Sequence, residues 1–430
     1  MYATSVSTAV RRLVPLLGAC FFVSIIDRTN VSVAALTMNT DLGLSAAAYG
    51  FGAGIFFVAY FLFELPSNLA LERFGARRWL ARIMVTWGIV SIGMGLIQND
   101  VTFYIARFLL GAAEAGFFPG VVFYLYQWFN SRNIARVLAL FSAFGPLANA
   151  IGAPLATSIM QAWGWRWVYV VEGVPAVLLA VVLLRALPDT IEDAPWLSDG
   201  QRRALREGLG HDPASARRIS WRTALRDPQS VLMCAQYLLI MTSSYALVLW
   251  LPQIIRSFDV SIGQTGWLTA IPFAAATLGL LAWGRSSART GEKLWHAVVP
   301  CLAASAAFVA GALTQQPAWA LALLSVGAVA IYCAPVGFWS LPRTFVSGAA
   351  AASATALANS FGNLGGFIGP YLSGWIRDAT GRFELGLALF GVPVLLGGLL
   401  TFVTIRMARP PSGDAPARTD ASPRMPGGRH

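Results

Sequence analysis

Charge is scarce in this chain, and the residue types that most often build catalytic centres are scarcer still. Only 12% of the 430 residues are charged, about half of the ~25% usual in soluble domains. There are three histidines, and the single lysine is Lys293. The sequence has no paired histidine ligands, no Gly-x-Ser-x-Gly motif and no phosphate-binding glycine loop with lysine. These absences argue against an enzyme, and we expect no cofactor and no metal.

Cysteine is also rare. Its four copies all fall inside apolar stretches, and they form neither a Cys-x-x-Cys pair nor a spacing typical of metal ligands. We interpret them as small buried apolar side chains. They are Cys20, Cys234, Cys301 and Cys333.

Long apolar runs, in contrast, are abundant. Hydrophobic residues make up 56% of the chain and gather in blocks of about 20 residues, enough for a helix to cross a ~30 Å hydrocarbon layer. The first block continues past the length of a signal-peptide core, so we interpret it as a span. The sequence therefore predicts an all-α polytopic membrane protein. Its twelve predicted transmembrane helices are 13–35, 47–69, 79–98, 101–126, 134–160, 166–187, 229–255, 262–284, 294–314, 318–341, 351–373 and 385–407.

The basic residues predict the orientation of these spans. The formal net charge is +11, which in a soluble protein would suggest a nucleic-acid partner. With both termini inside, however, 25 of the 31 lysines and arginines fall on the cytoplasmic side and four outside. Such a split is the expected signature of cytoplasmic loops. We therefore expect a multi-pass protein of the cell (inner) membrane with cytoplasmic termini and no nucleic-acid partner.

The two parts of the chain resemble each other at a fixed offset. Segment 144–155 recurs at 361–372 with six identical residues at an offset of 217, and segment 73–79 recurs in 289–295 at an offset of 216. This repeat predicts two pseudo-symmetric six-helix bundles. The predicted parts are an N-terminal half at 1–187, a cytoplasmic linker at 188–228, a C-terminal half at 229–407 and a disordered cytoplasmic tail at 408–430.

The loop after the second span carries a motif. Residues 68–78 read N-x-x-x-E-R-x-G-x-R-R, which resembles the signature loop of the major facilitator superfamily. The resemblance implies a six-plus-six fold and a conformational latch at Glu72, Arg73 and Arg77. An asparagine replaces the glycine with which the family's loop begins. The second-half copy has Ala288 at the acidic position, so we expect its latch to be weak or absent.

Four further segments narrow the resemblance to the anion:cation symporter branch of that superfamily. They read D-R-x-N at 27–30, F-E-L-P-S-N at 63–68, G-A-A-E-A-G-F-F-P-G at 111–120 and N-S-F-G-N-L-G-G at 359–366. The resemblance covers the chain from about residue 11 to residue 407. The chain looks most like the tartrate, phthalate, hydroxyphenylacetate and sugar-acid permeases, which implies a small organic anion as substrate.

Charged residues inside the predicted spans are the main candidates for a mechanism. A charge at the bilayer centre costs about 2.5–3.5 kcal/mol on insertion scales, so it needs a partner, a watery cavity or a function. The first span contains Asp27 and Arg28, and the fourth contains Arg107 and Glu114. Arg107 and Glu114 are seven residues apart and share one helix face. The two spans are therefore expected to line one polar path.

Each of these residues receives an expected role. Arg28 is expected to bind a substrate carboxylate. Asp27 and Glu114 are expected to carry protons, with Arg107 pairing with the ionised acid. In the sugar-acid symporters that the chain resembles, the matching arginine contacts substrate and the matching acids carry protons. The resemblance also implies three further substrate contacts, at Tyr60, Asn359 and Trp339.

A purely structural interpretation stays open for the same residues. Asp27–Arg28 and Arg107–Glu114 would then be ion pairs that only hold helices together. Two other acids lie near span ends or beside a Gly-x-Pro sequence, and for these we favour a helix cap or a latch to loop arginines. They are Glu64 and Glu172.

The sequence as a whole predicts a secondary active transporter. We expect it to import a small organic anion, a carboxylate, by proton symport with alternating access, with sodium as the alternative coupling ion. The competing hypothesis is a carrier of neutral or cationic solutes, or a drug exporter, on the same fold. A third is a membrane sensor that does not transport. We expect the lipid bilayer and the substrate as partners, and a monomer.

Overall fold

The computed structural model describes residues 2–130, 133–209, 225–339 and 349–407. Within these ranges the regular elements are helices and no strand occurs, so the predicted all-α fold is confirmed. The predicted tail at 408–430 and part of the predicted linker lie outside the described residues.

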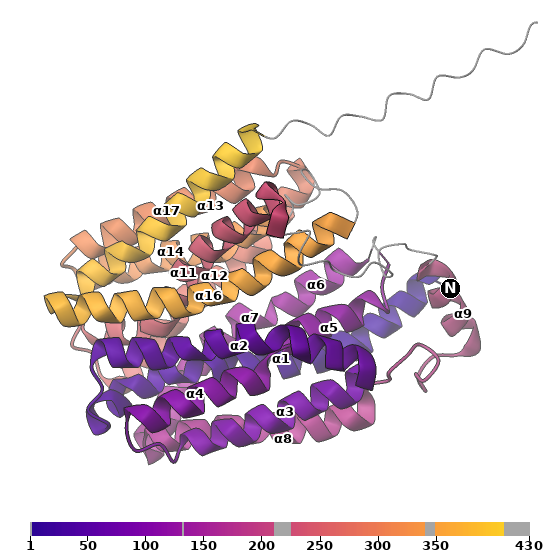
Figure 1. Cartoon of the computed structure of the whole chain (residues 1–430), viewed down its shortest axis with the longest axis horizontal. Coiled ribbons are helices and arrows are strands. Elements are labelled where there is room, and N and C mark those ends of the chain that lie inside the picture. The colour runs from indigo at the N-terminus through magenta and orange to yellow at the C-terminus, as the bar shows by residue number, and fades with distance from the viewer. Residues whose placement is uncertain (1, 131–132, 210–224, 340–348, 408–430) are drawn as a thin grey trace, which may run out of the picture.

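The helices run roughly along one common direction (Figure 1). In chain order they are α1 (Tyr2–Asp41), α2 (Ala46–Phe74), α3 (Ala76–Met94), α4 (Asp100–Glu114), α5 (Phe117–Tyr126), α6 (Ile134–Ser142), α7 (Phe144–Trp163), α8 (Trp165–Ala186), α9 (Asp199–Leu209), α11 (Pro228–Arg256), α12 (Ile262–Thr290), α13 (Leu294–Leu313), α14 (Pro317–Phe338), α16 (Ala349–Thr380) and α17 (Phe383–Met407).

Every predicted span coincides with helix, the fourth with α4 and α5 together and the fifth with α6 and α7. Ten segments are long and apolar enough to cross a membrane, which confirms ten of the predicted spans in length and composition. The predicted spans outside that set are those of α3, which contains Arg77, Arg78 and Arg82, and of α16, which is rich in glycine, serine and asparagine. That α3 and α16 also cross the membrane, which would make twelve crossings, therefore remains a prediction.

The fourth predicted span is broken beside a candidate residue. Gly116 adopts a φ of 85°, a left-handed conformation that suits glycine. A side chain at this position would also collide with Ser67 of α2. Helix α4 therefore ends at Glu114, and the chain restarts as α5 at Phe117. The break places the Glu114 carboxyl at a helix end in the middle of the bundle.

Two close helix pairs connect the first six predicted spans with the last six. Helix α2 packs along α16, and α7 packs along α12; α2 and α16 lie side by side in Figure 1. A Cβ added at Gly54 of α2 would lie 2.9 Å from the Cα of Phe367, and one at Gly266 of α12 would lie 3.0 Å from the Ala153 carbonyl oxygen. Small residues thus let these backbones approach closely.

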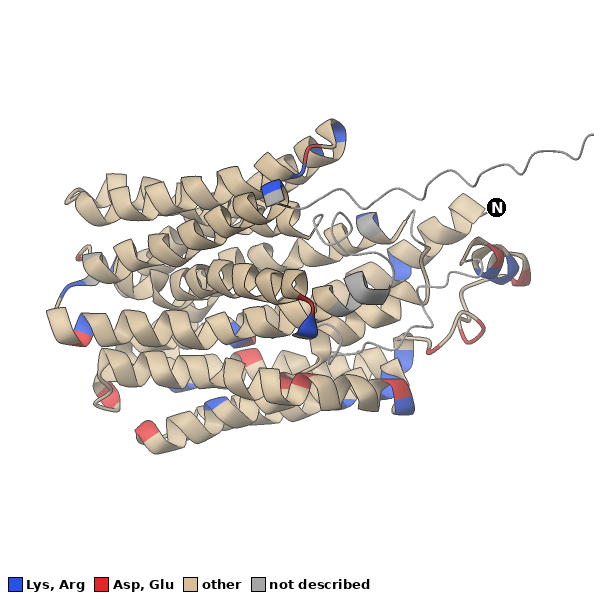
Figure 2. Cartoon of the chain, turned by 45° about the horizontal axis from the view of Figure 1, so that its top comes forward, with Lys and Arg blue, Asp and Glu red and all other residues tan. Residues whose placement is uncertain are grey.

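The two pairs also follow the sequence repeat. Residue 46, where α2 begins, maps onto residue 262, where α12 begins, at the offset of 216. Residue 144 of α7 maps onto residue 361 of α16 at the offset of 217. The contact between α2 and α16 is therefore the repeat counterpart of the contact between α12 and α7. Figure 2 shows that charged residues gather mainly towards the helix ends, with a few exceptions in the interior.

Candidate functional site

A buried ion pair between α1 and α4 forms the centre of the candidate site. The Arg28 Nη2 donates to Glu114 Oε1 at 2.5 Å, and the Ser24 hydroxyl donates to the same oxygen at 2.7 Å. Arg28 is 8% exposed and Glu114 is fully buried. Breaking such a pair by removing one partner typically costs about 3–5 kcal/mol, because an uncompensated charge stays buried. Neither residue can therefore lose its partner without a large cost in stability.

The two ion pairs of the purely structural interpretation, Asp27–Arg28 and Arg107–Glu114, do not form among the described residues. Among the described residues, the salt bridge of Arg28 is to Glu114, and neither Asp27 nor Arg107 forms one. Adjacent positions on a helix point about 100° apart, so Asp27 turns away from Arg28. Two residues that are adjacent in the sequence of a helix thus face different neighbouring helices.

Asp27 faces α3. Its Oδ1 accepts hydrogen bonds from the Ser91 hydroxyl and, at 3.3 Å, from the Asn30 amide. Its Oδ2 is buried and has no hydrogen-bond partner among the described residues. Asp27 therefore sits in a small polar group of its own, fully buried, and its second oxygen remains open to a proton or a further donor.

Arg107 is fully buried in α4 and bonds to backbone. Its Nη2 donates to the Ala53 carbonyl oxygen at 3.1 Å, and its guanidinium lies 4.8 Å from the ring centre of Phe56. The same ring lies 5.3 Å from the Arg28 guanidinium. Contacts of this kind stabilise a desolvated cation by about 2 kcal/mol. Arg107 is thus held beside the ion pair by α2, without an acid as a direct partner.

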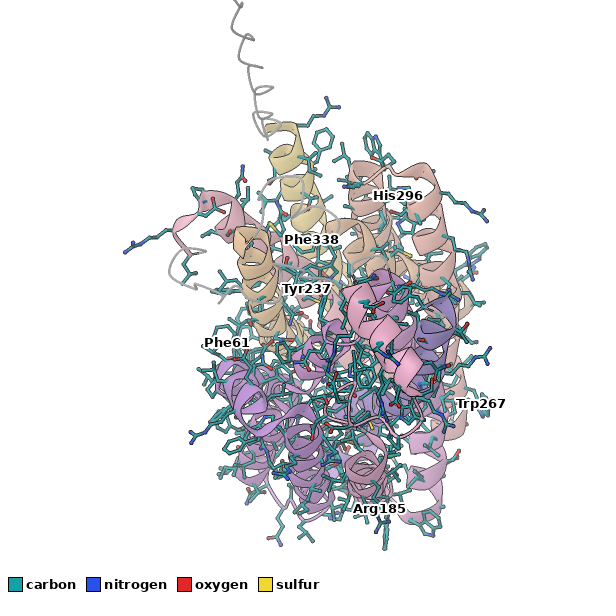
Figure 3. The ribbon with its side chains drawn as sticks, turned by 90° about the vertical axis from the view of Figure 1, so that its right-hand side faces the viewer. Phe61, Arg185, Tyr237, Trp267, His296 and Phe338 are labelled. Atoms are coloured by element: carbon teal, nitrogen blue, oxygen red, sulfur yellow. The ribbon has the colours of Figure 1, made fainter. Side chains whose placement is uncertain are left out.

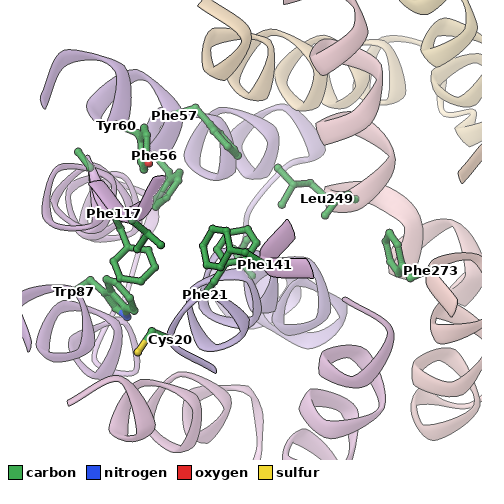
Figure 4. Packing of buried hydrophobic residues seen from close by; sticks show 14 of the residues in the cluster. Cys20, Phe21, Phe56, Phe57, Tyr60, Trp87, Phe117, Phe141, Leu249 and Phe273 are labelled. Atoms are coloured by element: carbon green, nitrogen blue, oxygen red, sulfur yellow. The ribbon is translucent and has the colours of Figure 1, made fainter. Parts of the chain in front are cut away.

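Aromatic side chains complete the surroundings of Arg28. The Tyr60 ring centre lies 5.1 Å from its guanidinium, so this predicted substrate contact does lie at the site. Figure 4 shows Phe56 next to Tyr60 in the packed interior. From α11, the Tyr245 side chain approaches Arg28, and its ring centre lies 4.2 Å from that of Phe57 with the two rings tilted by 51°. No sequence motif marks Tyr245.

Asn359 reaches the site through a residue that we interpreted differently. Its amide lies 3.4 Å from Glu64, which also accepts from Ser360 at 3.1 Å and from Asn363 at 3.3 Å. Glu64 is 5% exposed in α2, whereas all three donors lie on α16. The interpretation of Glu64 as a cap or a latch to loop arginines is therefore wrong. It is a buried link between the two helix sets.

A signal for this link was present in the sequence. Glu64 belongs to the F-E-L-P-S-N segment, and its donors belong to the N-S-F-G-N segment of α16. Both segments were identified for their family resemblance. Only the packing of α2 along α16 shows that they meet.

Trp339 lies in a separate aromatic group. Its ring centre is 4.6 Å from Tyr237 and 5.0 Å from Phe338. Figure 3 shows Tyr237 and Phe338 close together, with ring centres 5.0 Å apart. In the described part of the chain, no ring or polar contact joins Trp339 to Arg28.

The predicted latch residues lie at the end of α2 and the start of α3. Glu72 and Arg73 are exposed, and Glu72 pairs with no arginine within the ranges that the structure describes. Arg77 instead meets Asp189, whose carboxylate lies 3.4 Å from its Nε and accepts from its backbone N–H at 3.0 Å. The acid that fixes this loop thus comes from the segment that follows α8.

The arrangement suits the exchange of charged binding partners rather than the making or breaking of covalent bonds. A guanidinium, a carboxylate and a hydroxyl meet at one buried point, with a second acid and a second arginine close by. No group of three or more His, Cys, Asp or Glu side chains suited to a metal occurs among the described residues. The geometry fits binding of a charged solute and movement of a proton.

Known proteins with similar sequences are transporters. A tartrate transporter, so named provisionally, from Agrobacterium vitis is 43% identical over 92% of this chain and 90% of its own length. A quinolone resistance transporter from Acinetobacter baumannii is 41% identical over 93% of this chain and 94% of its own length.

Fold and family agree with these relatives. The structure of a bacterial homologue of the human lysosomal transporter Spinster, inward-facing and unoccupied, matches with a TM-score of 0.77 at 17% identity, over 93% of this chain and 97% of that one. The sequence profile described as Major Facilitator Superfamily matches residues 17–370 and 233–427. The chain therefore belongs to the Major Facilitator Superfamily, and it is a multi-pass membrane transporter rather than an enzyme.

Proposed function

We propose that this transporter imports a small organic anion, a carboxylate, together with protons. The observation that carries the proposal is the buried pair of Arg28 and Glu114. A substrate carboxylate is the natural competitor of Glu114 for the guanidinium, because both present the same group to the same donors. The relative named for tartrate supports an organic acid as the solute.

Competition for Arg28 explains coupling to a proton. If an anion replaces Glu114 at the guanidinium, the displaced carboxylate stays buried without a partner, which is costly. A proton on Glu114 removes that cost. Anion and proton therefore bind together, and neither is favoured alone. Asp27, with one unpartnered oxygen, is the proposed second proton carrier.

The proposal retains the predicted topology. Halves 1–187 and 229–407 rock about the site. The hydrogen bonds between Glu64 and its donors on α16 break and re-form as the halves move. Both termini lie in the cytoplasm, the membrane is the cell (inner) membrane and the transporter works as a monomer. Glu72, Arg73 and Arg77 act as a latch at the cytoplasmic end. Trp339 joins the substrate contacts when the aromatic group around Tyr237 moves inward.

Proton entry into proteoliposomes tests the proposal. An internal pH dye is read after addition of tartrate, sugar acids, phthalate or hydroxyphenylacetate, with sodium present or replaced by choline. We expect one class of acid to acidify the lumen without sodium, and the Arg28→Ala variant to give no response. The matched control is Arg406→Ala, which changes an exposed arginine at the end of α17.

The competing hypothesis, a drug exporter, is favoured by one relative, the quinolone resistance transporter. A quinolone in the same panel separates the two. Drug uptake into inside-out vesicles without any response to the small acids would contradict the import proposal. Exchange of labelled acid in counterflow, which needs no ion gradient, would support it even if the coupling ion is sodium.

A further inference from the structure

A further buried acid, Glu172 of α8, lies apart from the Arg28–Glu114 pair. It is 3% exposed, and neither of its oxygens forms a hydrogen bond of standard geometry among the described residues, with the Asn30 side chain as its polar neighbour. It forms no salt bridge there either. Its interpretation as a helix cap or a latch to loop arginines is therefore wrong. A buried ionisable group without a partner calls for a function.

Glu172 lines a small cavity between the two helix sets. The cavity has a volume of about 20 Å³ and is walled by residues of α1, α7 and α8 on one side and of α11 and α12 on the other. Glu172 lies about 10 Å along α8 from Trp165, at 1.5 Å per residue. A space of this size holds one water-sized occupant.

The polar wall of this cavity consists mainly of acceptors. The Asn30 amide donates to Asp27 and the Asn149 amide donates to Tyr332 at 2.8 Å, and both side-chain oxygens have no partner in the described chain. With the two oxygens of Glu172, they give four unpaired acceptor atoms around one space.

The remaining polar groups of the wall have no hydrogen to spare. The hydroxyls of Thr29, Ser32 and Thr269 each donate to a carbonyl oxygen of their own helix, at 2.7–2.8 Å. Pro252 also lines the cavity and lacks the N–H that would pair with the carbonyl of Val248, another lining residue. The wall therefore attracts positive charge, and a neutral water with two hydrogens cannot offset a carboxylate.

We propose that this cavity binds one small monovalent cation, with Glu172 supplying the charge and Asn30 and Asn149 supplying neutral oxygens. The shared chemistry is a single positive charge, held either as a proton on Glu172 or as Na⁺. Oxygen ligands from carboxylates and amides are those that hard cations prefer.

The position of the cavity gives the cation an effect on conformation. Because its wall comes from both helix sets, separating α7 from α12 would widen the cavity and remove part of that wall. The Asn149–Tyr332 hydrogen bond, between α7 and α14, spans the same boundary. A cation bound at Glu172 therefore stabilises the closed arrangement. The effect of the cation on a transport cycle rests on the proposed function. The existence of the cation-binding site does not.

Thermal unfolding of the purified full-length protein tests the site without any anion. Na⁺ is titrated against choline at constant ionic strength, and pH is varied separately in choline. The titratable groups near Glu172 are Asp27 on α1 and Tyr169 on its own helix. The variants are Glu172→Gln and Asn149→Ala. The control is Glu64→Gln, since that buried acid already has three donors.

We expect the wild type to be stabilised by Na⁺ or, failing that, by lower pH. Glu172→Gln should abolish that response, Asn149→Ala should weaken it several-fold, and Glu64→Gln should keep it. A response to Na⁺ assigns the cation as sodium, and a response to pH alone assigns it as a proton. Identical responses in the wild type and in folded Glu172→Gln would overturn the proposal. If Glu172→Gln does not fold, an unchanged response in Asn149→Ala would overturn it instead.

Discussion

The first six predicted spans and the last six share a repeat but differ in charge. Every buried Asp, Glu and Arg of the described residues lies in the first set: Asp27, Arg28, Glu64, Arg107, Glu114 and Glu172. The second set provides amides, hydroxyls and aromatic rings instead. We infer that the first set holds the ion and substrate chemistry, whereas the second closes over it.

One pair of repeat positions makes the difference concrete. At the offset of 216, Asp27 corresponds to Ser243 of α11. The Ser243 hydroxyl donates to the Phe390 carbonyl at 2.6 Å and accepts from the Val394 N–H at 3.1 Å. The first set thus has a titratable acid with one oxygen that forms no hydrogen bond in the described chain. The second set has a serine whose hydroxyl both donates and accepts a hydrogen bond between two helices. The two sets thus share their helix packing, whereas the titratable group at this position occurs in the first set alone.

The largest effect is expected from Arg28→Ala. It leaves Glu114 buried and alone, at a cost of about 3–5 kcal/mol, so we expect anion transport to fall by at least about 100-fold. Counterflow of the labelled acid measures this. Arg28→Lys should not restore transport, because an ammonium lacks the planar fork of donors. Transport near the wild-type rate in Arg28→Ala would remove the charged site from the mechanism.

Asp27→Asn should have the next largest effect. The amide can still accept from Ser91, but it cannot take up a proton. We expect acid-driven proton entry to fall about tenfold, while counterflow changes little. The internal pH dye and counterflow are compared on the same vesicles. The second-set equivalent, Ser243→Ala, should lower stability by about 1 kcal/mol and leave proton coupling intact.

Glu64→Gln tests the contact between the two sets. Three donors from α16 lose a charged acceptor, and hydrogen bonds to charged groups contribute about 1.5–3 kcal/mol each before compensation by the amide. We expect the maximal transport rate to change several-fold with a smaller change in the half-saturating anion concentration. Ser360→Ala, which removes one of the donors, should give a weaker form of the same change. A change in anion affinity alone would instead make Glu64 part of the binding site.

The smallest effect should follow from Asp189→Asn. Its ion pair with Arg77 is partly exposed, and such pairs contribute about 0–1 kcal/mol. We expect less than about a threefold change in transport rate, and this change should disappear in high salt. A larger loss that persists in salt would show that this loop is part of the central mechanism.

Much of the fold could be predicted from the sequence because a bilayer imposes simple rules. Apolar blocks of fixed length gave the helices, and the repeat anticipated that α2 and α12 occupy equivalent places. The break at Gly116 was missed, since apolar residues continue through it. Hydropathy reports length and composition, but it does not report one backbone angle.

The site was predicted in composition but not in pairing. Asp27, Arg28, Arg107, Glu114 and Tyr60 were all identified, yet the partner of Arg28 was not. Partners are chosen between helices, and that choice depends on rotation about each helix axis. The roles of Glu64 and Glu172 were missed for the same reason, since their surroundings come from α16 and from four other helices.

Proton uptake on anion binding tests the central claim most directly. Purified protein in weakly buffered solution is mixed with the acid identified in the vesicle assay, and the change in pH is followed in the wild type and in Glu114→Gln. The account predicts that the wild type takes up protons as the anion binds, and that Glu114→Gln binds the anion without taking up a proton at this site. Anion binding to the wild type with no proton uptake, or equal uptake in both proteins, would contradict it.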